Sequence, residues 1–160
     1  MMAAERDSDT ELRELYRELI LDHARHPRNF GTLDSATHTA RGINPLCGDK
    51  LTLYLAVDAD GTIGATAFEG SGCAISVASA SLMTELVRGI PAAAARGYFE
   101  TVTRRLTGAA ADAGGEDPAL ARIRALDGVR EFPSRVKCAT LAWHALDSAL
   151  GNASGPVTTE

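Results

Sequence analysis

The most informative stretch of the sequence is residues 44–49, which read Asn44-Pro45-Leu46-Cys47-Gly48-Asp49. Gly48 can adopt positive φ angles, so Cys47 and Asp49 can turn toward one point instead of toward opposite faces of a strand. A thiol and a carboxylate that converge in this way suit a metal ion. A plain turn with an incidental cysteine fits the same short motif, so the positions of the other two cysteines decide between the two interpretations.

The segments on either side of this stretch are expected to be strands. Residues 37–43 can form one strand, and residues 51–57 alternate Leu and Val with Thr, Tyr and Ala, as a strand with one buried face does. Asp58-Ala59-Asp60-Gly61 has the composition of a turn, and residues 63–68 supply a returning strand. The three segments predict an antiparallel sheet with the Cys47 turn at one end.

Apolar residues that recur at helical spacing predict about five helices around this sheet. The expected helices cover residues 10–25, the segment opened by Gly70-Ser71-Gly72-Cys73, residues 91–106, residues 117–126 and residues 134–150. A capping-box pattern at Ser8-Asp9-Thr10-Glu11 places the start of the first helix near Thr10, and Ser134 is the expected N-cap of the last. The predicted fold class is therefore α+β, a three-stranded antiparallel sheet packed by about five helices.

The length of 160 residues suits one domain with one core. We expect a flexible N-terminus over residues 1–9, a single domain over residues 10–150 and a disordered polar tail over residues 151–160. Residues 107–116 are rich in Ala and Gly without apolar periodicity, which predicts a mobile connector inside that domain.

Charge and composition argue against two classes of partner. The formal net charge is −5 and no basic cluster is present, so nucleic acid is not expected as a partner. The sequence has neither a secretory signal pattern nor an apolar run long enough to span a bilayer, so we expect no membrane role and a cytoplasmic location. An odd number of cysteines, three, fits a reducing compartment better than a disulfide framework.

The remaining cysteines lie near the starts of two expected helices. There, unpaired amide groups and the helix dipole favour a thiolate at Cys73 and, in the first turns of the last helix, at Cys138. Together with Cys47 and Asp49 they make a set of four ligands, the number that zinc prefers, although the fold would have to bring them together. The alternative is three unrelated buried thiols that act as small hydrophobic residues.

Two other residues could be taken for site residues. His23 lies near the end of the first helix, where we expect a solvated histidine rather than a ligand or base. Trp143 lies on the apolar face of the last helix and is expected in the core rather than as a platform for a substrate.

The chain resembles the IscU/NifU-like family of iron–sulfur assembly proteins, and most of all its SufU branch. The resemblance rests on Leu21-Asp22-His23 with Pro27-Arg28-Asn29-Phe30-Gly31, on residues 44–49, on Gly70-Ser71-Gly72-Cys73-Ala74-Ile75-Ser76, and on Ser134-Arg135-Val136-Lys137-Cys138-Ala139-Thr140-Leu141. Scaffold proteins of the IscU type carry a histidine immediately before the last cysteine, where this chain has Lys137, and a shorter link between the second and third cysteines. A protonated lysine cannot ligate a metal as neutral imidazole can, which favours the SufU branch.

This resemblance implies an IscU/SufU-like fold and a zinc-dependent sulfurtransferase. Such a protein accepts persulfide sulfur from a SufS-type cysteine desulfurase and passes it toward downstream iron–sulfur assembly proteins. The implied zinc ligands are Cys47, Asp49, Cys73 and Cys138. Cys47 is the expected catalytic sulfur acceptor, because it stands on a loop beside a glycine while the other two cysteines are fixed on helices.

Two other functions stay open from the sequence. An IscU-type scaffold would hold an iron–sulfur cluster in place of zinc. A zinc-stabilised adaptor would use the same ligands without any catalytic role.

Overall fold

The computed structural model describes residues 2–115, 117–151 and 155–159. Its helices are α1 (Met2–Arg25), α2 (Ala74–Val87), α3 (Ala92–Leu106), the 3-10 helices η1 (Pro118–Leu120) and η2 (Ile123–Glu131), and α4 (Pro133–Leu150). Its strands are β1 (His38–Asn44), β2 (Asp49–Val57), β3 (Ile63–Ser71) and β4 (Val157–Thr158). Within these residues, no helix combines the length and the apolar character needed to cross a membrane.

The α+β class is confirmed, but the sheet has four strands rather than three and is mixed rather than antiparallel. The strand order is β3-β2-β1-β4, with β2 antiparallel to both of its neighbours and β4 parallel to β1. After α4 the chain returns along the free edge of β1, where the backbone amide of Thr159 donates to the carbonyl of Ile43. A two-residue strand is too short to show an alternating sequence pattern. It forms because the edge of β1 offers unpaired backbone groups.

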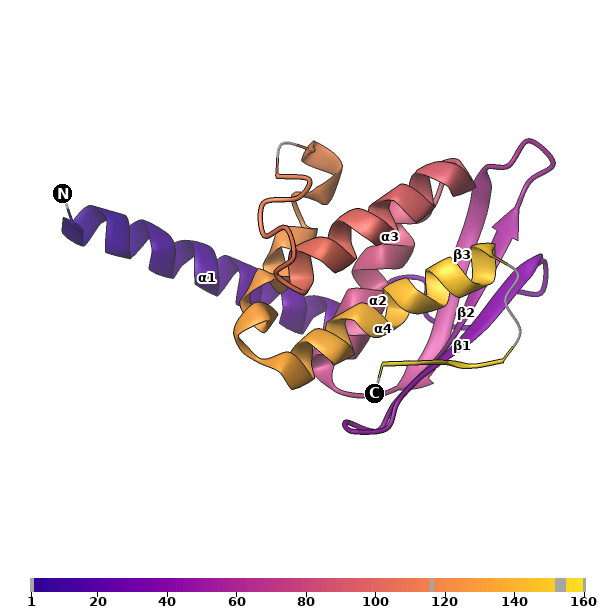
Figure 1. The fold of residues 1–160 in the computed structure, drawn as a ribbon, viewed down its shortest axis with the longest axis horizontal. Coiled ribbons are helices and arrows are strands. Elements are labelled where there is room, and N and C mark those ends of the chain that lie inside the picture. The colour runs from indigo at the N-terminus through magenta and orange to yellow at the C-terminus, as the bar shows by residue number, and fades with distance from the viewer. Residues whose placement is uncertain (1, 116, 152–154, 160) are drawn as a thin grey trace.

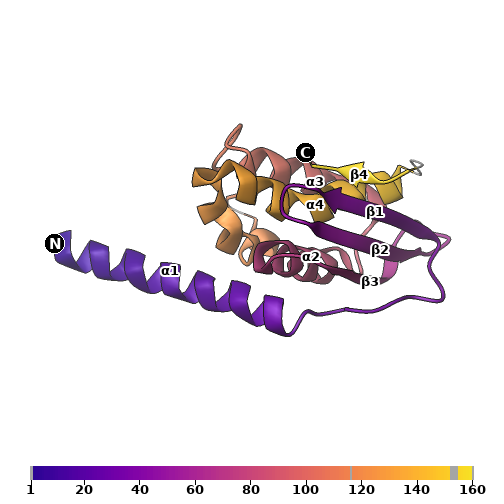
Figure 2. The same cartoon turned by 90° about the horizontal axis from the view of Figure 1, so that it is seen from below.

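Helices cover one face of this sheet (Figures 1 and 2). α2 packs against β3, and α4 packs against β1 and β2. The alternation predicted for β2 is confirmed, because Leu51, Leu53 and Leu55 are all buried. Trp143 of α4 is fully buried and donates from Nε1 to Ser79 Oγ of α2 at 3.1 Å, so it is the core residue that we expected.

Two predicted helix starts are wrong. α1 begins at Met2 instead of near Thr10, because residues 2–6 read Met-Ala-Ala-Glu-Arg, which are good helix formers, and the helix runs on through the capping-box pattern. α4 has Phe132 as its N-cap, not Ser134, and Pro133 takes the first helical position, which proline tolerates well. In both views α1 projects beyond the rest of the molecule (Figures 1 and 2).

The segment between α3 and α4 is more structured than we expected. Asp117 caps η1 by accepting from the Ala119 amide at 2.9 Å, as the sequence indicated, but the expected single helix through Leu126 is divided into η1 and η2. Buried Arg105 binds Asp127 with two hydrogen bonds, of 2.7 and 2.6 Å, and also donates to the carbonyl of Ala113 at 3.1 Å. The expected mobile connector is therefore tied to α3 and η2.

The division into a flexible start, one domain and a disordered tail stays a prediction for the chain as a whole. It differs from the structure at residues 2–9, which are helical, and at Val157–Thr158, which form β4. Residues 1, 152–154 and 160 of these two segments lie outside the described part of the chain.

His23 is fully buried, which corrects the expectation of a solvated residue. A hydrogen bond of 2.7 Å joins its Nδ1 to Ser81 Oγ of α2, and its Nε2 lies 3.6 Å from Glu85 Oε1. Ser81 Oγ also accepts from the backbone amide of Arg28. His23 therefore connects the end of α1 and the following turn to α2, a contact that the position of a histidine on one helix cannot reveal.

We expect His23 to make stability depend on pH. Burial, reinforced by the positive charge of Arg28, lowers the pKa of His23 below its ordinary value of 6.5. The unfolded chain therefore binds the proton more readily, so the contribution of His23 is complete above about pH 6.5 and is lost as the pH falls toward the folded-state value. Thermal unfolding between about pH 7 and 5 should show a steeper decrease in Tm for the natural sequence than for His23→Gln. Parallel curves would contradict this expectation.

Candidate metal centre

The four residues proposed as ligands lie at one end of the sheet, on three separate parts of the fold. Cys47 lies in the turn of residues 45–48 between β1 and β2, and Asp49 is the first residue of β2. Cys73 is the N-cap of α2, as expected, and Cys138 lies in the second turn of α4. The sheet and the two helices packed on it thus bring together residues that are far apart in the sequence.

Asp49 is the residue around which the cluster is built. One ligand atom each from Cys47, Asp49 and Cys138 lie within 4.8 Å of one another, a group that could hold a metal ion. Cys73 lies outside this group of three, but its Sγ is 4.0 Å from Asp49 Oδ2. All three predicted cysteines are therefore neighbours of the Asp49 carboxylate.

Asp49 is fully buried, and the hydrogen-bond donors to its carboxylate within the described part of the chain are neutral. Its Oδ1 accepts from the backbone amide of Cys73 at 2.8 Å, and its Oδ2 accepts from Asn44 Nδ2 at 3.2 Å. Among the residues that the structure describes, no basic side chain forms an ion pair with it. Because a buried charge is costly unless it is paired or coordinates a metal, this environment favours a bound cation.

Cys138 is buried, and the helix start does not favour a thiolate there as the sequence predicted. It lies beyond the first turn of α4, so the amides of the helix start do not determine its state. Burial raises the pKa of its thiol well above the ordinary value, and the hydrogen bond with Asp49 acts in the same direction. A thiolate at this position therefore needs a positive charge beside it, which a metal ion supplies.

Cys47, by contrast, is exposed. Gly48 has φ +69°, the left-handed conformation expected from the motif, and Leu46 on the other side of Cys47 is 66% exposed. Cys73 is half-buried, and its Sγ accepts from the backbone amide of Ser76 at 3.5 Å. The turn thus presents one thiol to solvent, while the helices hold the other two less accessibly.

Two residues of the centre have roles that the sequence did not reveal. Asn44 donates from Nδ2 to Asp49 Oδ2 and also to Cys138 Sγ, the latter at 3.4 Å. Gly72 lies so close to Asp49 that an added Cβ would be 2.5 Å from Oδ1. Both residues belong to the motifs that carry the ligands, but only the folded contacts show what they touch.

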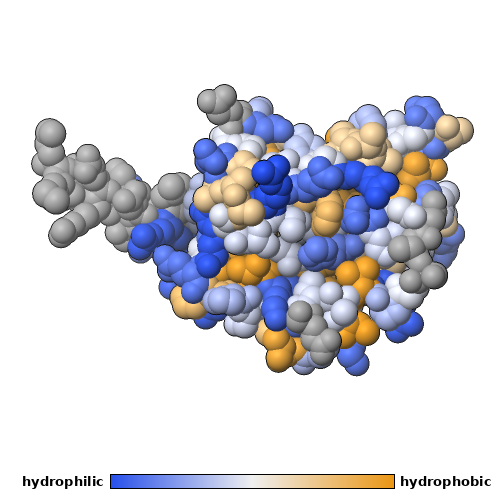
Figure 3. All heavy atoms as spheres, in the orientation of Figure 1, coloured by the Kyte–Doolittle hydropathy of each residue, from blue (hydrophilic) through white to orange (hydrophobic). Residues whose placement is uncertain are grey.

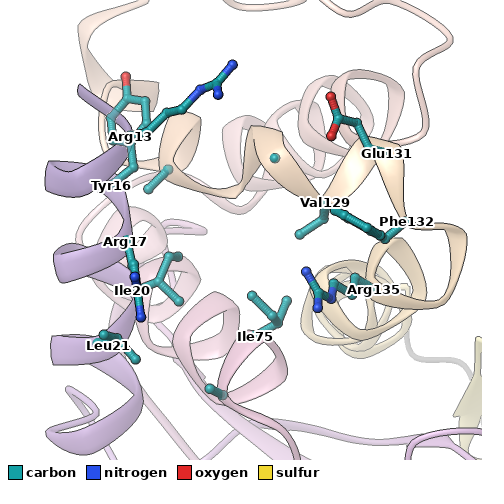
Figure 4. Close-up of a pocket in the computed structure, with 13 residues that line it drawn as sticks. Arg13, Tyr16, Arg17, Ile20, Leu21, Ile75, Val129, Glu131, Phe132 and Arg135 are labelled. Carbon is teal, nitrogen blue, oxygen red and sulfur yellow. The ribbon is translucent and has the colours of Figure 1, made fainter. Parts of the chain in front are cut away.

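A hollow of about 560 Å³ lies beside the centre (Figure 4). It is bounded by α1 on one side and by η2 with the start of α4 on the other, and Ala74 and Ile75 of α2 extend its lining to the residue after Cys73. Its lining includes the apolar side chains of Tyr16, Ile20, Leu21, Ile75, Val129 and Phe132, and the arginines Arg13, Arg17 and Arg135. Within the described part of the chain, none of these three arginines forms an ion pair.

Comparison with known proteins identifies the family. Residues 15–153 match the family model described as the NifU-like N-terminal domain, so the chain belongs to that family. Within it, the zinc-dependent sulfurtransferase SufU of Bacillus subtilis is 38% identical over 141 residues, which cover 88% of this chain and 92% of the relative. The iron–sulfur cluster assembly scaffold protein IscU of Thermotoga maritima is 39% identical over 142 residues, 89% of this chain and 96% of the relative.

A solved structure supports the same relationship. The SufU of Fervidobacterium islandicum, described as an iron–sulfur cluster assembly scaffold protein for the SUF system, superposes with a TM-score of 0.75 at 32% identity. The superposition covers 83% of this chain and 94% of that one. The IscU/SufU-like fold expected from the sequence is therefore confirmed, and so is the resemblance to the SufU branch.

Replacing Gly72 by alanine should disturb the centre without unfolding the protein. The new methyl group would displace the Asp49 carboxylate from the Cys73 amide, because the backbone leaves no room for both. We expect purified Gly72→Ala to contain clearly less metal per chain than the natural sequence, measured by elemental analysis. Gly97→Ala in α3, where an added Cβ meets nothing within 4 Å, is the matched control and should keep its metal. A full metal content in Gly72→Ala would contradict this role of Gly72.

Proposed function

We propose that the protein is a zinc-dependent sulfurtransferase that accepts persulfide sulfur from a cysteine desulfurase for iron–sulfur cluster assembly. The observation that carries this proposal is the asymmetry of the centre, in which exposed Cys47 stands beside buried Asp49 and buried Cys138. An acceptor thiol must be reachable by a partner, whereas ligands that hold a metal do not need to be. The family and the named sulfurtransferase relative support the same function.

The proposed zinc ligands are Cys47, Asp49, Cys73 and Cys138. Three sulfur donors and one carboxylate suit zinc in both number and type. The buried carboxylate, which forms no ion pair with the residues that the structure describes, fits a site for a cation. When bound, zinc would keep the thiols deprotonated without redox chemistry of its own. Asp49, Cys73 and Cys138 would remain as anchors, because each is fixed at a strand or helix.

Cys47 is the proposed catalytic residue. Its thiolate would attack the terminal sulfur of a persulfide on the partner enzyme, so that a new S–S bond forms at Cys47. The S–S bond in the partner breaks at the same time, and the cysteine of the partner leaves as a thiolate. Sulfur is thus transferred with no net oxidation or reduction, and Cys47 carries the persulfide toward cluster assembly.

The hollow beside the centre is the surface that we propose for docking the desulfurase. It combines an apolar lining with three arginines against one carboxylate, that of Glu131, and this excess of positive charge favours a partner segment with apolar and acidic side chains. In the view of Figure 3, apolar surface is divided into small patches by hydrophilic side chains.

Replacing Cys47 by alanine should abolish the stimulation of a cysteine desulfurase while leaving the fold intact. Cys47 lies in an exposed turn and contributes little to the core, so its loss removes the acceptor thiol without opening a cavity. The measurement is desulfurase turnover with and without the variant, together with thermal unfolding. Undiminished stimulation by the folded variant would overturn the assignment of Cys47.

The double variant Arg13→Glu, Arg17→Glu should weaken docking without affecting the centre. We expect the concentration needed for half-maximal stimulation to increase at least several-fold, with the maximal rate and zinc content unchanged, because surface charges act on encounter rather than on chemistry. Arg88→Glu with Arg104→Glu is the matched control, since both residues are exposed and lie outside the hollow. Equal effects of the two double variants would mean that net charge, not the hollow, determines docking.

A scaffold function is the second candidate, because several relatives are named iron–sulfur cluster scaffolds. Anaerobic reconstitution with iron and sulfide separates the two functions. A stable cluster that transfers to an apoprotein would support the scaffold, whereas tightly bound zinc without a cluster supports the sulfurtransferase. If substitutions at Cys47, Cys73 and Cys138 all unfold the chain alike, the adaptor function is favoured instead.

The cytoplasmic location and the absence of nucleic-acid partners stay predictions from the sequence.

A further inference from the structure

We propose that Asn44 is a positioning residue of the metal centre, which fixes Asp49 and Cys138 in the orientation that binds the ion. This inference rests on the zinc site proposed above, but not on the sulfur-transfer reaction. It concerns a residue that binds no metal itself and acts through two residues that do.

The contacts of the Asn44 side chain carry the inference. A single atom, Nδ2, lies 3.2 Å from Asp49 Oδ2 and 3.4 Å from Cys138 Sγ. An amide nitrogen carries two hydrogens, so it can donate to both acceptors at once. Asn44 is fully buried, so water does not compete for either bond.

Asn44 connects two ligands that otherwise belong to different parts of the molecule. It ends β1 directly opposite Asp49 at the start of β2, and it reaches Cys138 on α4. Because the other oxygen of Asp49 accepts from the Cys73 amide, both carboxylate oxygens are held by hydrogen bonds. The bond from Asn44 therefore prevents the carboxylate from rotating and keeps it in register with the sulfur of Cys138.

A purely structural role for Asn44 explains the contacts less well. Asparagine is common at the start of turns, where its side chain binds the backbone of the turn. Here the side-chain hydrogen bonds found within the described residues go to Asp49 and Cys138 instead. Oδ1 is buried and has no hydrogen-bond partner among the residues that the structure describes. An apolar residue would avoid this cost, so the polar side chain is better explained by the two ligands that it orients.

The test is the affinity for zinc, measured by competition with a chromophoric chelator. Asn44→Leu keeps a similar volume but removes the donor, and we expect its zinc dissociation constant to increase about 10- to 100-fold, as when the residues that orient metal ligands are lost. With Co²⁺ as the probe, the sulfur-to-metal absorption band should also shift, because the geometry at Cys138 changes. Thr66→Val is the control, since Thr66 is also buried and its hydroxyl donates to the carbonyl of Thr84, away from the centre.

Each outcome decides the proposal. A folded Asn44→Leu protein with the zinc affinity and Co²⁺ spectrum of the natural sequence would overturn it, and so would an equal loss of affinity in Thr66→Val. If Asn44→Leu does not fold, the same two measurements on Asn44→Ala decide in the same way. Desulfurase stimulation is measured separately, so natural protein that binds zinc without stimulating the enzyme would refute the sulfurtransferase function and leave the role of Asn44 intact.

Discussion

The candidate metal centre depends on one hydrogen bond, from the backbone amide of Cys73 to the buried carboxylate of Asp49 at 2.8 Å. It joins the start of β2 to the start of α2 and so fixes the β1–β2 turn against the helix that carries the second thiol. The bond is possible because Gly72 has no side chain to occupy the same space. It also satisfies one of the amides that every helix start leaves unpaired, so it serves the fold and the site together.

The packing of α2 against α4 determines where the third thiol lies. Ser79 of α2 donates to the carbonyl of Ala139 at 2.5 Å and accepts from Trp143, so the two helices are held by polar as well as apolar contacts. Ala139 directly follows Cys138, and a shift at this contact would therefore move that sulfur. Small residues on α2 permit the close approach, because Ala78, Ala80 and Ser79 are all buried.

The sequence predicted the parts of the fold that depend on local pattern. The alternation in β2, the glycine at 48 and the helix start at Cys73 each reflect the conformational preference of a short segment, and each is found in the structure. The strand β4 and the burial of His23 could not be predicted in this way, since both depend on which distant segment packs beside them. The contacts of Asn44 were missed for the same reason, because its partner Cys138 comes from a helix near the other end of the chain.

The charge of the proposed ligand set would favour the release of one ligand. Three thiolates and one carboxylate carry more negative charge than a single divalent ion neutralises, so the loss of one thiolate costs less than it would from a neutral site. The ligand that leaves must take its charge into a solvated environment, because an uncompensated buried charge is strongly unfavourable. Cys138 would leave into the protein interior, whereas Cys47 would leave into solvent. Burial therefore separates Asp49 and Cys138, which would stay as anchors, from exposed Cys47, which would be the transferable ligand, before any contact with a partner is made.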